Sequence, residues 1–393
     1  MIIERDIVQT LEKRLKEPCP LQVVLGPRQV GKTTALQQLI RRWSHPSHYA
    51  TADLPSPPDS HWIQTQWQMA RQLIRHPRRA GLLVLDEVQK VSRWSEVVKA
   101  LVDEDRRERI PLRVVLLGSS SLQVRKGAQE SLAGRFELLF CPHWSYEECR
   151  KAFGWKLEEW LYFGGYPGSA RMRRSQDRWS LYIRESLVES VLARDVLHLS
   201  PVLKPALLRQ LFSTVVRCPA QILSYNKMLG SLQDAGNTVT LAHYLQLLSN
   251  AYLVTGLQQW HGGAMRVKGS IPKIVVWNNA LINGMTGIHL KETRRQTDVW
   301  GHLVENAVGA HLLNHAVSEG FEVYYWRHGN DEVDYVIRKG NALLALEVKS
   351  GERVRRSGLG TFLQRWPKAK TMIVGTGGIP FPHFFSVSPK EWF

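Results

Sequence analysis

The amino-acid sequence predicts an α/β protein with more than one domain, and three observations carry this prediction. Short apolar runs at 21–25, 82–85 and 114–117 alternate with helical patterns near the N-terminus, which is typical of a parallel sheet with helices on its faces. The chain has 393 residues, enough for two or three domains. Its 44% hydrophobic and 22% charged residues are typical of folded globular proteins and exclude a disordered or fibrous chain.

The first predicted strand leads into a phosphate-binding loop. A helix is expected over 32–42, and the motif G-x-x-x-x-G-K-[ST] stands between the strand and this helix, the context that the motif requires. Glycines let backbone N–H groups face a phosphate, the lysine reaches the β and γ phosphates, and the hydroxyl that follows it holds Mg²⁺. The residues expected to bind nucleotide are Gly26, Pro27, Arg28, Gln29, Val30, Gly31, Lys32, Thr33 and Thr34. The expected cofactors are ATP and Mg²⁺.

The second predicted strand ends in two carboxylates, Asp86 and Glu87. Asp86 is predicted to position Mg²⁺ together with Thr33, and Glu87 to orient or deprotonate the attacking water. The alternative is a solvent-exposed strand end. Together with the phosphate loop, the pair predicts hydrolysis of ATP and not binding alone.

The third predicted strand is followed by hydroxyl side chains. Ser119 and Ser120 compete for the role of sensing the γ-phosphate, while Arg135 is a candidate for stabilising charge in the transition state, from its own subunit or from a neighbour. A structural role is an equal alternative for each. The stretch 44–60, with its four prolines, is expected to be a loop.

The middle of the chain is predicted to be helical. The pattern over 158–199 is helical around a turn at 163–168, where glycines stand next to a proline. Three short helices are expected between 205 and 256, the last beginning at Thr240, followed by a strand over 251–255. Three helices and a strand suggest a winged helix-turn-helix.

The last part of the chain is predicted to be a mixed α/β unit. A helix is expected near 302–318, with strands at 322–326, 332–337 and 342–349. A turn at 338–341 joins the last two strands into a hairpin.

Several motifs together resemble a widespread prokaryotic family of AAA-type ATP-binding proteins with a C-terminal domain of uncharacterised function. They are Gly-Pro-Arg-Gln-Val-Gly-Lys-Thr-Thr (26–34), Leu-Asp-Glu-Val-Gln (85–89), Gly-Ser-Ser-Ser (118–121), Leu-Ala-Gly-Arg (132–135) and Gly-Gly-Tyr-Pro (164–167). The resemblance implies a P-loop AAA-type ATPase core over 1–199, a winged helix over 200–260 and a restriction-endonuclease-like domain over 261–393. The sequence departs from the family at 277–281, where the family carries an Asp before a Gly-Leu pair.

The C-terminal hairpin is predicted to bring two carboxylates and a lysine together. Asp334 falls opposite 345–347, and Glu347 and Lys349 share one face of their strand. This set resembles the D, E-x-K core of restriction-type nucleases, in which Asp334 and Glu347 would hold Mg²⁺ and Lys349 would orient or activate the attacking water. Glu305 could add an acidic contact. The alternatives are a salt-bridged hairpin and a nuclease fold that has kept only a binding role.

Charge points to a polyanionic partner. The chain carries 52 Lys and Arg and 35 Asp and Glu, a formal net charge of +17, and each third of the chain is basic. Such a charge favours DNA, and the basic pieces at 171–174, 294–295 and 353–356 are candidates for phosphate contacts. A solvated basic surface is the alternative.

The remaining sequence features bear on compartment and assembly. The four cysteines form no C-x-x-C pair, so neither a disulfide framework nor a zinc site is expected. The N-terminal residues do not resemble a signal peptide and no apolar run is long enough to cross a membrane, so a cytoplasmic protein without membrane contact is expected. AAA-type modules often form rings, so a homo-oligomer is expected.

Two functions remain open from the sequence. The first is a Mg²⁺-dependent ATPase whose nucleotide state controls a DNA-engaging, nuclease-like C-terminal domain. The second is a signalling or scaffolding ATPase that acts on a protein partner and does not cut nucleic acid.

Overall fold

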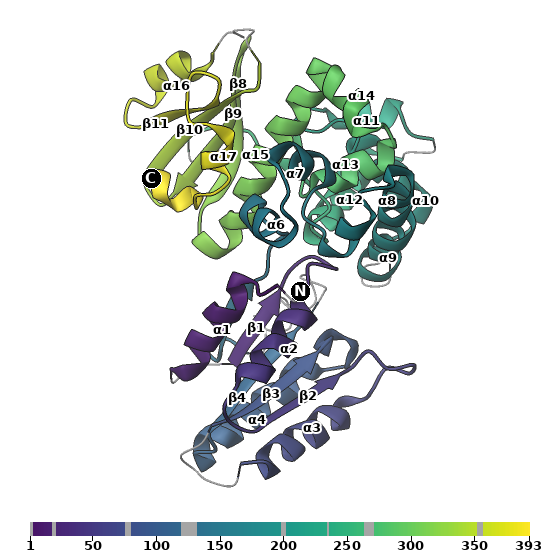
Figure 1. Cartoon of the computed structure of the whole chain (residues 1–393), viewed down its shortest axis with the longest axis vertical. Coiled ribbons are helices and arrows are strands. Elements are labelled where there is room, and N and C mark those ends of the chain that lie inside the picture. The colour runs from purple at the N-terminus through teal and green to yellow at the C-terminus, as the bar shows by residue number, and fades with distance from the viewer. Residues whose placement is uncertain are drawn as a thin grey trace. The chain divides into compact units, whose positions relative to one another are not determined.

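The structure is a computed structural model that describes residues 3–17, 21–74, 80–118, 132–197, 202–233, 236–262, 271–351 and 357–393. The chain divides into two compact units, Met1–Cys141 and Pro142–Phe393, called here the first and the second unit (Figure 1). Each unit is described by itself. In the part of the chain that the structure describes, no helix combines the length and apolar character needed to cross a membrane.

The first unit is a five-stranded parallel sheet between helices. Its strands are arranged in the order β2-β3-β4-β1-β5, and every neighbouring pair is parallel. The strands are β1 (Leu21–Leu25), β2 (Ser47–Thr51), β3 (Gly81–Asp86), β4 (Leu112–Leu117) and β5 (Phe136–Phe140). The helices are α1 (Asp6–Lys16), α2 (Lys32–Arg42), α3 (Ser60–Gln72) and α4 (Trp94–Glu108).

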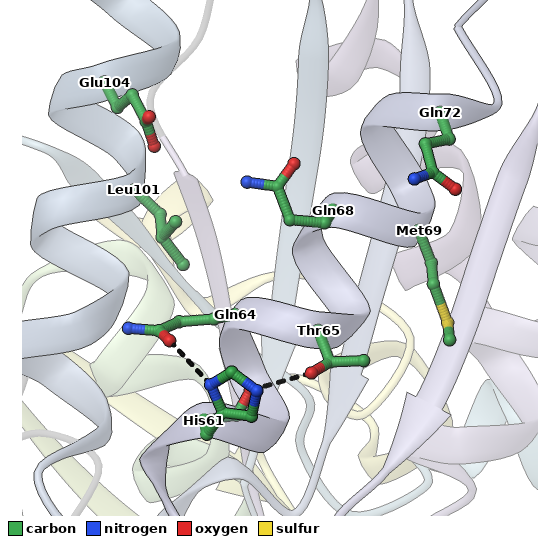
Figure 2. A pocket seen from close by; sticks show the side chains of 8 residues that line it. All are labelled: His61, Gln64, Thr65, Gln68, Met69, Gln72, Leu101 and Glu104. Carbon is green, nitrogen blue, oxygen red and sulfur yellow. Dashed lines mark hydrogen bonds between the residues drawn. The ribbon is translucent and has the colours of Figure 1, made fainter.

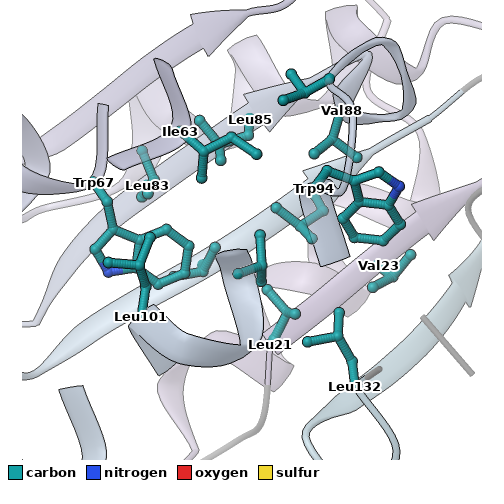
Figure 3. Close-up of a cluster of buried hydrophobic side chains, with 14 of the residues drawn as sticks. Leu21, Val23, Ile63, Trp67, Leu83, Leu85, Val88, Trp94, Leu101 and Leu132 are labelled. Atoms are coloured by element: carbon teal, nitrogen blue, oxygen red, sulfur yellow. The ribbon is translucent and has the colours of Figure 1, made fainter. Parts of the chain in front are cut away.

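Helices cover both faces of this sheet, and alternate residues of each central strand point to opposite faces, so both sets of side chains are buried. On β1, Leu21 and Val23 pack with α3 and α4, in a core that also contains Trp67 and Trp94 (Figure 3). Val24 packs on the other side with α1 and α2. The parallel α/β class predicted from the apolar runs is therefore confirmed for this unit.

The prediction of a continuous loop over 44–60 is wrong, because this stretch contains β2. The strand pairs with β3 alone at the edge of the sheet, with Thr51 opposite Asp86. All five of its residues are only partly buried, so they show neither an apolar run nor a clear alternation. An edge strand of this kind leaves little signal in a sequence. The strand at the opposite edge, β5, was likewise absent from the prediction.

The second unit begins with helices. They are α6 (Tyr146–Phe153), α7 (Leu157–Phe163), α8 (Gln176–Leu181), α9 (Glu189–Val191), and two π-helical segments at Tyr182–Val188 and Leu192–Leu197. The predicted turn after α7 is present. A Cβ on Gly164 would lie 1.9 Å from Asn278 Oδ1, and one on Gly165 would lie 2.2 Å from the Trp144 carbonyl oxygen. The backbone N–H of Gly165 donates to Asn278 Oδ1 at 3.1 Å, so the glycines permit a close backbone contact.

Three helices and a pair of strands follow in the second unit. They are α10 (Pro205–Val215), α11 (Tyr225–Gly230), α12 (Thr238–Asn250), β6 (Val254–Leu257) and β7 (Lys273–Val276). Asn237 caps α12 by accepting a hydrogen bond from the Thr240 N–H at 2.9 Å. Strands β6 and β7 are antiparallel.

The second unit ends in a four-stranded sheet and the helices around it. The helices are α13 (Asn279–Thr286), α14 (Leu290–Arg295), α15 (Thr297–Glu319), α16 (Leu359–Arg365) and α17 (Phe381–Phe384), and the strands are β8 (Glu322–His328), β9 (Asp331–Lys339), β10 (Ala342–Lys349) and β11 (Lys370–Gly375). The order is β11-β10-β9-β8. Strands β8, β9 and β10 are antiparallel, whereas β11 runs parallel to β10. The three strands predicted from the sequence are all present.

Candidate functional site

The phosphate loop lies between β1 and α2, as the motif predicts. Gly26 and Gly31 have positive φ values of 155° and 90°. A Cβ on Gly26 would lie 2.1 Å from the Cys141 carbonyl oxygen, whereas a Cβ on Gly31 would have no atom within 4 Å. Gly26 therefore allows the loop to approach the strand behind it, and Gly31 borders open space at the N-terminus of α2, where backbone N–H groups favour an anion.

The side chain of Lys32 is folded onto the loop that precedes it. Its ammonium donates hydrogen bonds to the carbonyl oxygens of Gly26 at 2.9 Å and Pro27 at 2.6 Å, and the residue is buried. These acceptors are neutral, so the bonds are weaker than ion pairs.

Asp86 ends β3 and is held by three donors. Its Oδ2 atom accepts hydrogen bonds from Thr33 Oγ1 at 2.8 Å and Tyr49 Oη at 3.0 Å, and its Oδ1 atom accepts one from the Glu87 N–H at 2.9 Å. Burial raises the pKa of Asp86, while the bond from Thr33 opposes this effect. The structure thus joins Thr33 and Asp86, the two residues predicted to hold Mg²⁺ in this unit.

Tyr49 is a residue of this site that the sequence did not indicate. It lies on β2, in the stretch expected to be a loop, and a tyrosine there matches no motif. Burial raises its pKa, and the neighbouring Asp86 carboxylate acts in the same direction, so the phenol remains a hydrogen-bond donor.

Glu87 follows Asp86 with a positive φ of 55°, a left-handed conformation that is uncommon outside glycine. Its Oε2 atom accepts a hydrogen bond from Gln89 Nε2. Glu87, the residue predicted to orient the attacking water, is therefore hydrogen-bonded to the neutral amide of Gln89 in the same motif.

For the other predicted site residues of the first unit, Ser119, Ser120 and Arg135, the structure describes no contact with Thr33 or Asp86. Ser119 and Ser120 lie outside the described residues. Arg135 makes two bonds to Asp103, from Nε to Oδ1 at 2.7 Å and from Nη2 to Oδ2 at 3.0 Å. Within its own chain, Arg135 is therefore engaged by a carboxylate.

The donor set around Thr33 and Asp86 fits a magnesium nucleotide. Hydroxyl and carboxylate oxygens are the hard ligands that Mg²⁺ takes, usually with substrate phosphates and water completing its shell. The loop that binds phosphate precedes Thr33 directly, so the nucleotide and the metal would share one edge of the sheet.

In the second unit, the hairpin of β9 and β10 has the predicted register. Tyr335 pairs with Leu346, and the Val348 N–H donates to Asp334 Oδ2 at 2.7 Å. Glu347 Oε1 accepts from Lys349 Nζ and its Oε2 accepts from Ser357 Oγ. Asp334, Glu347 and Lys349 thus lie near the same end of the hairpin, each with partners from its own chain.

Lys273, which the sequence analysis did not indicate, lies among the carboxylates near this end of the hairpin. The side chain of Lys273 is fully buried, and its ammonium lies 2.7 Å from Glu305 Oε1, 3.2 Å from Glu332 Oε1 and 3.6 Å from Asp334 Oδ1. The signal that could have revealed it was a lysine directly before the apolar run Ile274 to Val276. A lysine in such a strand requires a buried partner.

Burial shifts the pKa values of this group. Burial by itself would lower the pKa of Lys273, but the carboxylates of Glu305 and Asp334 outweigh it and hold the pKa well above the usual value. Burial, reinforced by Asp334, raises the pKa of Glu305 to about 7. Lys273 therefore remains protonated in the folded chain. Within the described ranges, no group of three or more His, Cys, Asp or Glu side chains is arranged to hold a metal ion.

The residues considered for DNA contact are partly paired. Arg294 Nη2 lies 2.6 Å from Glu158 Oε1, and Arg173 forms an ion pair with Glu159. On α12, Ser249 Oγ and Thr255 Oγ1 are 2.7 Å apart. Residues 353–356 lie outside the described part of the chain.

A groove between α3 and α4 is a further hollow of the first unit (Figure 2). It has a volume of about 560 Å³. His61 Nδ1 lies 3.0 Å from Gln64 Oε1 along its wall. The lining residues are His61, Gln64, Thr65, Gln68, Met69, Gln72, Leu101 and Glu104. Most are neutral and polar, and no predicted site residue is among them.

Three family descriptions match successive parts of the chain. Residues 19–150 match an AAA domain, residues 154–292 match a domain of unknown function (DUF8612), and residues 300–383 match a second domain of unknown function (DUF4143). The nucleotide-binding part thus has a family description, whereas the two parts of the second unit match families without an assigned function.

The proteins to which the chain is similar include two that are described as uncharacterised. One from Mycobacterium tuberculosis is 28% identical over 350 residues, which cover 89% of this chain and 74% of that protein. One from Methanocaldococcus jannaschii is 24% identical over 359 residues, which cover 86% and 75%.

Among solved structures, the chain resembles the Walker-type ATPase PABY2304 of Pyrococcus abyssi, with a TM-score of 0.48 and 13% identity over 73% of this chain and 96% of that one. The RuvB Holliday junction branch migration motor of Thermotoga maritima gives a TM-score of 0.36 and 15% identity over 65% and 90%. The match of residues 19–150, the parallel sheet and the phosphate loop agree with one another. The first unit has the fold of an AAA-type ATPase.

Proposed function

We propose that the protein is a Mg²⁺-dependent ATPase whose nucleotide cycle controls the engagement of DNA by the second unit. The observation that carries the ATPase part is the hydrogen bond of 2.8 Å between Thr33 Oγ1 and Asp86 Oδ2. It joins the end of the phosphate loop to the carboxylate of the neighbouring motif, which is the arrangement needed to hold a magnesium nucleotide.

Each residue of the site has a role in this proposal. Lys32 exchanges the carbonyl oxygens of its loop for the β and γ phosphates. Thr33 and Asp86 hold Mg²⁺, which neutralises charge on the phosphates when it is bound. Glu87 leaves Gln89 and orients the attacking water, while Ser119 or Ser120 senses the γ-phosphate.

Arg135 is proposed to stabilise charge in the transition state, from its own subunit or from a neighbour in a homo-oligomer. Its bonds to Asp103 must then open when it acts. Arg135→Ala subunits mixed with Lys32→Ala subunits separate the two cases. Recovery of hydrolysis in the mixture supports action from a neighbour, and a sum of the two residual rates contradicts it.

The DNA part of the proposal rests on charge and topology. A formal net charge of +17 favours a polyanion. Helices α10, α11 and α12 followed by the antiparallel pair β6 and β7 support a winged helix, a fold that often binds DNA. If this domain is restriction-endonuclease-like and nucleolytic, as the sequence motif suggests, Asp334, Glu347 and Lys349 are the residues that would cleave DNA.

A protein-partner switch is the second candidate function. Two arginines considered for phosphate contacts, Arg173 and Arg294, are paired with glutamates of α7. Helix α12 exposes His243 and Gln246 and contains no Lys or Arg. These observations favour a signalling or scaffolding ATPase over one that grips DNA.

The deciding experiment is ATP hydrolysis by wild type and by Lys32→Ala, each with and without linear and branched duplex DNA. The proposal expects hydrolysis that is stimulated several-fold by DNA and is absent in Lys32→Ala. Hydrolysis that is indifferent to DNA supports the partner switch, and equal rates in both proteins contradict the ATPase itself. A DNA-binding titration in rising salt checks the same point, because phosphate contacts make affinity fall steeply with salt.

A further inference from the structure

The acidic region of the second unit surrounds a cation that belongs to the chain. Lys273, on β7, lies between Glu305 on α15 and Glu332 and Asp334 on β9. These four residues are called here the lysine cluster. Glu347 and Lys349 on β10 form a second pair beside it, since Asp334 accepts a hydrogen bond from the Val348 N–H.

The oxygens that a divalent metal would use are already engaged. Asp334 Oδ2 accepts from Val348, and Oδ1 faces the ammonium of Lys273 at 3.6 Å. Glu347 offers Oε1 to Lys349 and Oε2 to Ser357. In a nuclease of the D, E-x-K type, the corresponding carboxylates face one metal ion. The residues present here do not fit Mg²⁺ at Asp334 and Glu347.

Lys273 is fixed in this position by its surroundings. Its side chain has no exposed surface, and its ammonium lies 5.2 Å from the centre of the Tyr335 ring, a further favourable contact for a cation. Its backbone pairs with Leu257 and forms a bridge to Ile222. A surface lysine could swing into water and leave room for a metal, but this side chain is enclosed on all sides.

We propose that Lys273 is the resident cation of the lysine cluster and takes the place that a divalent metal has in nucleases of this type. An ammonium and a divalent cation repel each other strongly at such distances in a buried site. The second unit therefore does not bind a divalent metal through Asp334, and it engages its target without metal-dependent cleavage. The carboxylates instead join β7 to α15 and β9.

Terbium luminescence tests this proposal, because Tb³⁺ binds at carboxylate sites and emits when an adjacent tyrosine transfers energy to it. Tyr335 supplies that tyrosine. The full-length chain is used with Asp86→Asn, which removes the carboxylate proposed to hold Mg²⁺ in the first unit, and is compared with the double variant Asp86→Asn, Asp334→Asn. The proposal expects equal emission from both proteins. A saturable one-equivalent signal that Asp334→Asn abolishes would overturn it.

The converse experiment removes the resident cation. Lys273→Met in the Asp86→Asn background keeps an unbranched side chain and should gain one equivalent of bound Tb³⁺, which Asp334→Asn should remove again. If the folded Lys273→Met protein gains none, Lys273 is not what excludes the metal, and the proposal fails. Circular dichroism checks folding, and if Lys273→Met does not fold, the first comparison decides alone. Neither experiment depends on ATP hydrolysis or on DNA binding.

Discussion

In the described part of the chain, two acidic sites have a lysine beside them, and the two sites differ in the groups that contact their charged side chains. In the first unit, Asp86 accepts hydrogen bonds from the hydroxyls of Thr33 and Tyr49, and Lys32 donates to backbone carbonyls. In the second unit, the ammonium of Lys273 lies directly against carboxylates. The hydrogen bonds described at the first site join charged groups to neutral ones, whereas in the lysine cluster charged groups contact each other.

This difference indicates which site is open to a ligand. A hydrogen bond with one charged partner contributes about 1.5–3 kcal/mol, and a phosphate and Mg²⁺ would replace the neutral partners of Lys32 and Asp86 with charged ones. Removing one member of a buried ion pair costs about 3–5 kcal/mol, so the lysine cluster resists the same exchange. In a site that must bind and release a ligand, we therefore expect the charged side chains to form hydrogen bonds that a ligand can replace.

The largest expected effect is on the first site. Glu87→Gln keeps the size of the side chain and its contact with Gln89 but removes the charge that orients or deprotonates water. We expect hydrolysis to fall by about 10²–10⁴-fold while nucleotide affinity stays within about twofold of wild type. Phosphate release and binding of a fluorescent nucleotide measure the two quantities.

Nucleotide binding that is lost together with hydrolysis in Glu87→Gln would contradict a role restricted to the water.

The second prediction contrasts the two lysines in stability. Lys273→Met should destabilise the second unit by about 3–5 kcal/mol, because it leaves buried carboxylates without their cation. Lys32→Met should destabilise the first unit less, because the carbonyl oxygens of Gly26 and Pro27 that lose a donor are neutral and no buried charge is left without its counter-ion. Urea unfolding followed by intrinsic tryptophan fluorescence measures both.

Equal losses in the two lysine variants would break the comparison between the sites. Adding Glu305→Gln to Lys273→Met should recover part of the loss, since it removes one of the unpaired charges.

A smaller effect is expected at Tyr49. Tyr49→Phe removes one donor to Asp86 and leaves Thr33 in place, so Asp86 is less firmly oriented toward the metal. We expect the Mg²⁺ concentration for half-maximal hydrolysis to rise about fivefold, the equivalent of about 1 kcal/mol, with the maximal rate nearly unchanged. Titration of hydrolysis with Mg²⁺ measures this, with Tyr225→Phe in the second unit as the control. An unchanged Mg²⁺ requirement would show that Thr33 and the Glu87 N–H are sufficient to position Asp86.

The sequence was sufficient for the parts of the site that lie close together in the chain. The strand, the phosphate loop and the helix that begins at Lys32 were predicted because a nucleotide requires them in this order. The hairpin register that brings the Val348 N–H to Asp334 was also predicted, because a short turn and a period of two leave little freedom.

The parts that were missed depend on contacts between distant segments. Tyr49 meets Asp86 only because β2 pairs with β3, and an edge strand of partly buried residues carries little pattern. Lys273 meets Glu305 and Asp334 across three elements, so no local spacing reveals the cluster. In both cases the missing information is tertiary packing, which a single sequence does not contain.

The smallest expected effect separates the lysine cluster from another buried group of the second unit. Burial and the neighbouring His315 hold the pKa of His311, on α15, well below 6.5, although its contact with the Val387 carbonyl acts in the opposite direction. Below pH 6.5 the unfolded chain takes up a proton that folded His311 does not, so stability falls as the pH falls, by at most about 1.4 kcal/mol per pH unit. Glu305 has the opposite sign, because its pKa is raised from 4.5 to about 7 and stability falls as the pH rises between these values.

Comparison of wild type with His311→Gln isolates the imidazole, because the contribution of Glu305 is common to both proteins. Gln keeps a donor for the Val387 carbonyl but does not titrate. The stability of His311→Gln relative to wild type should rise as the pH is lowered from 8 to 5.5, measured by urea unfolding of the second unit. A difference that does not change with pH would show that His311 is not the source of the acid sensitivity. A difference that grows as the pH falls would assign this acid sensitivity to the imidazole of His311, which lies beside Phe384 and Phe385.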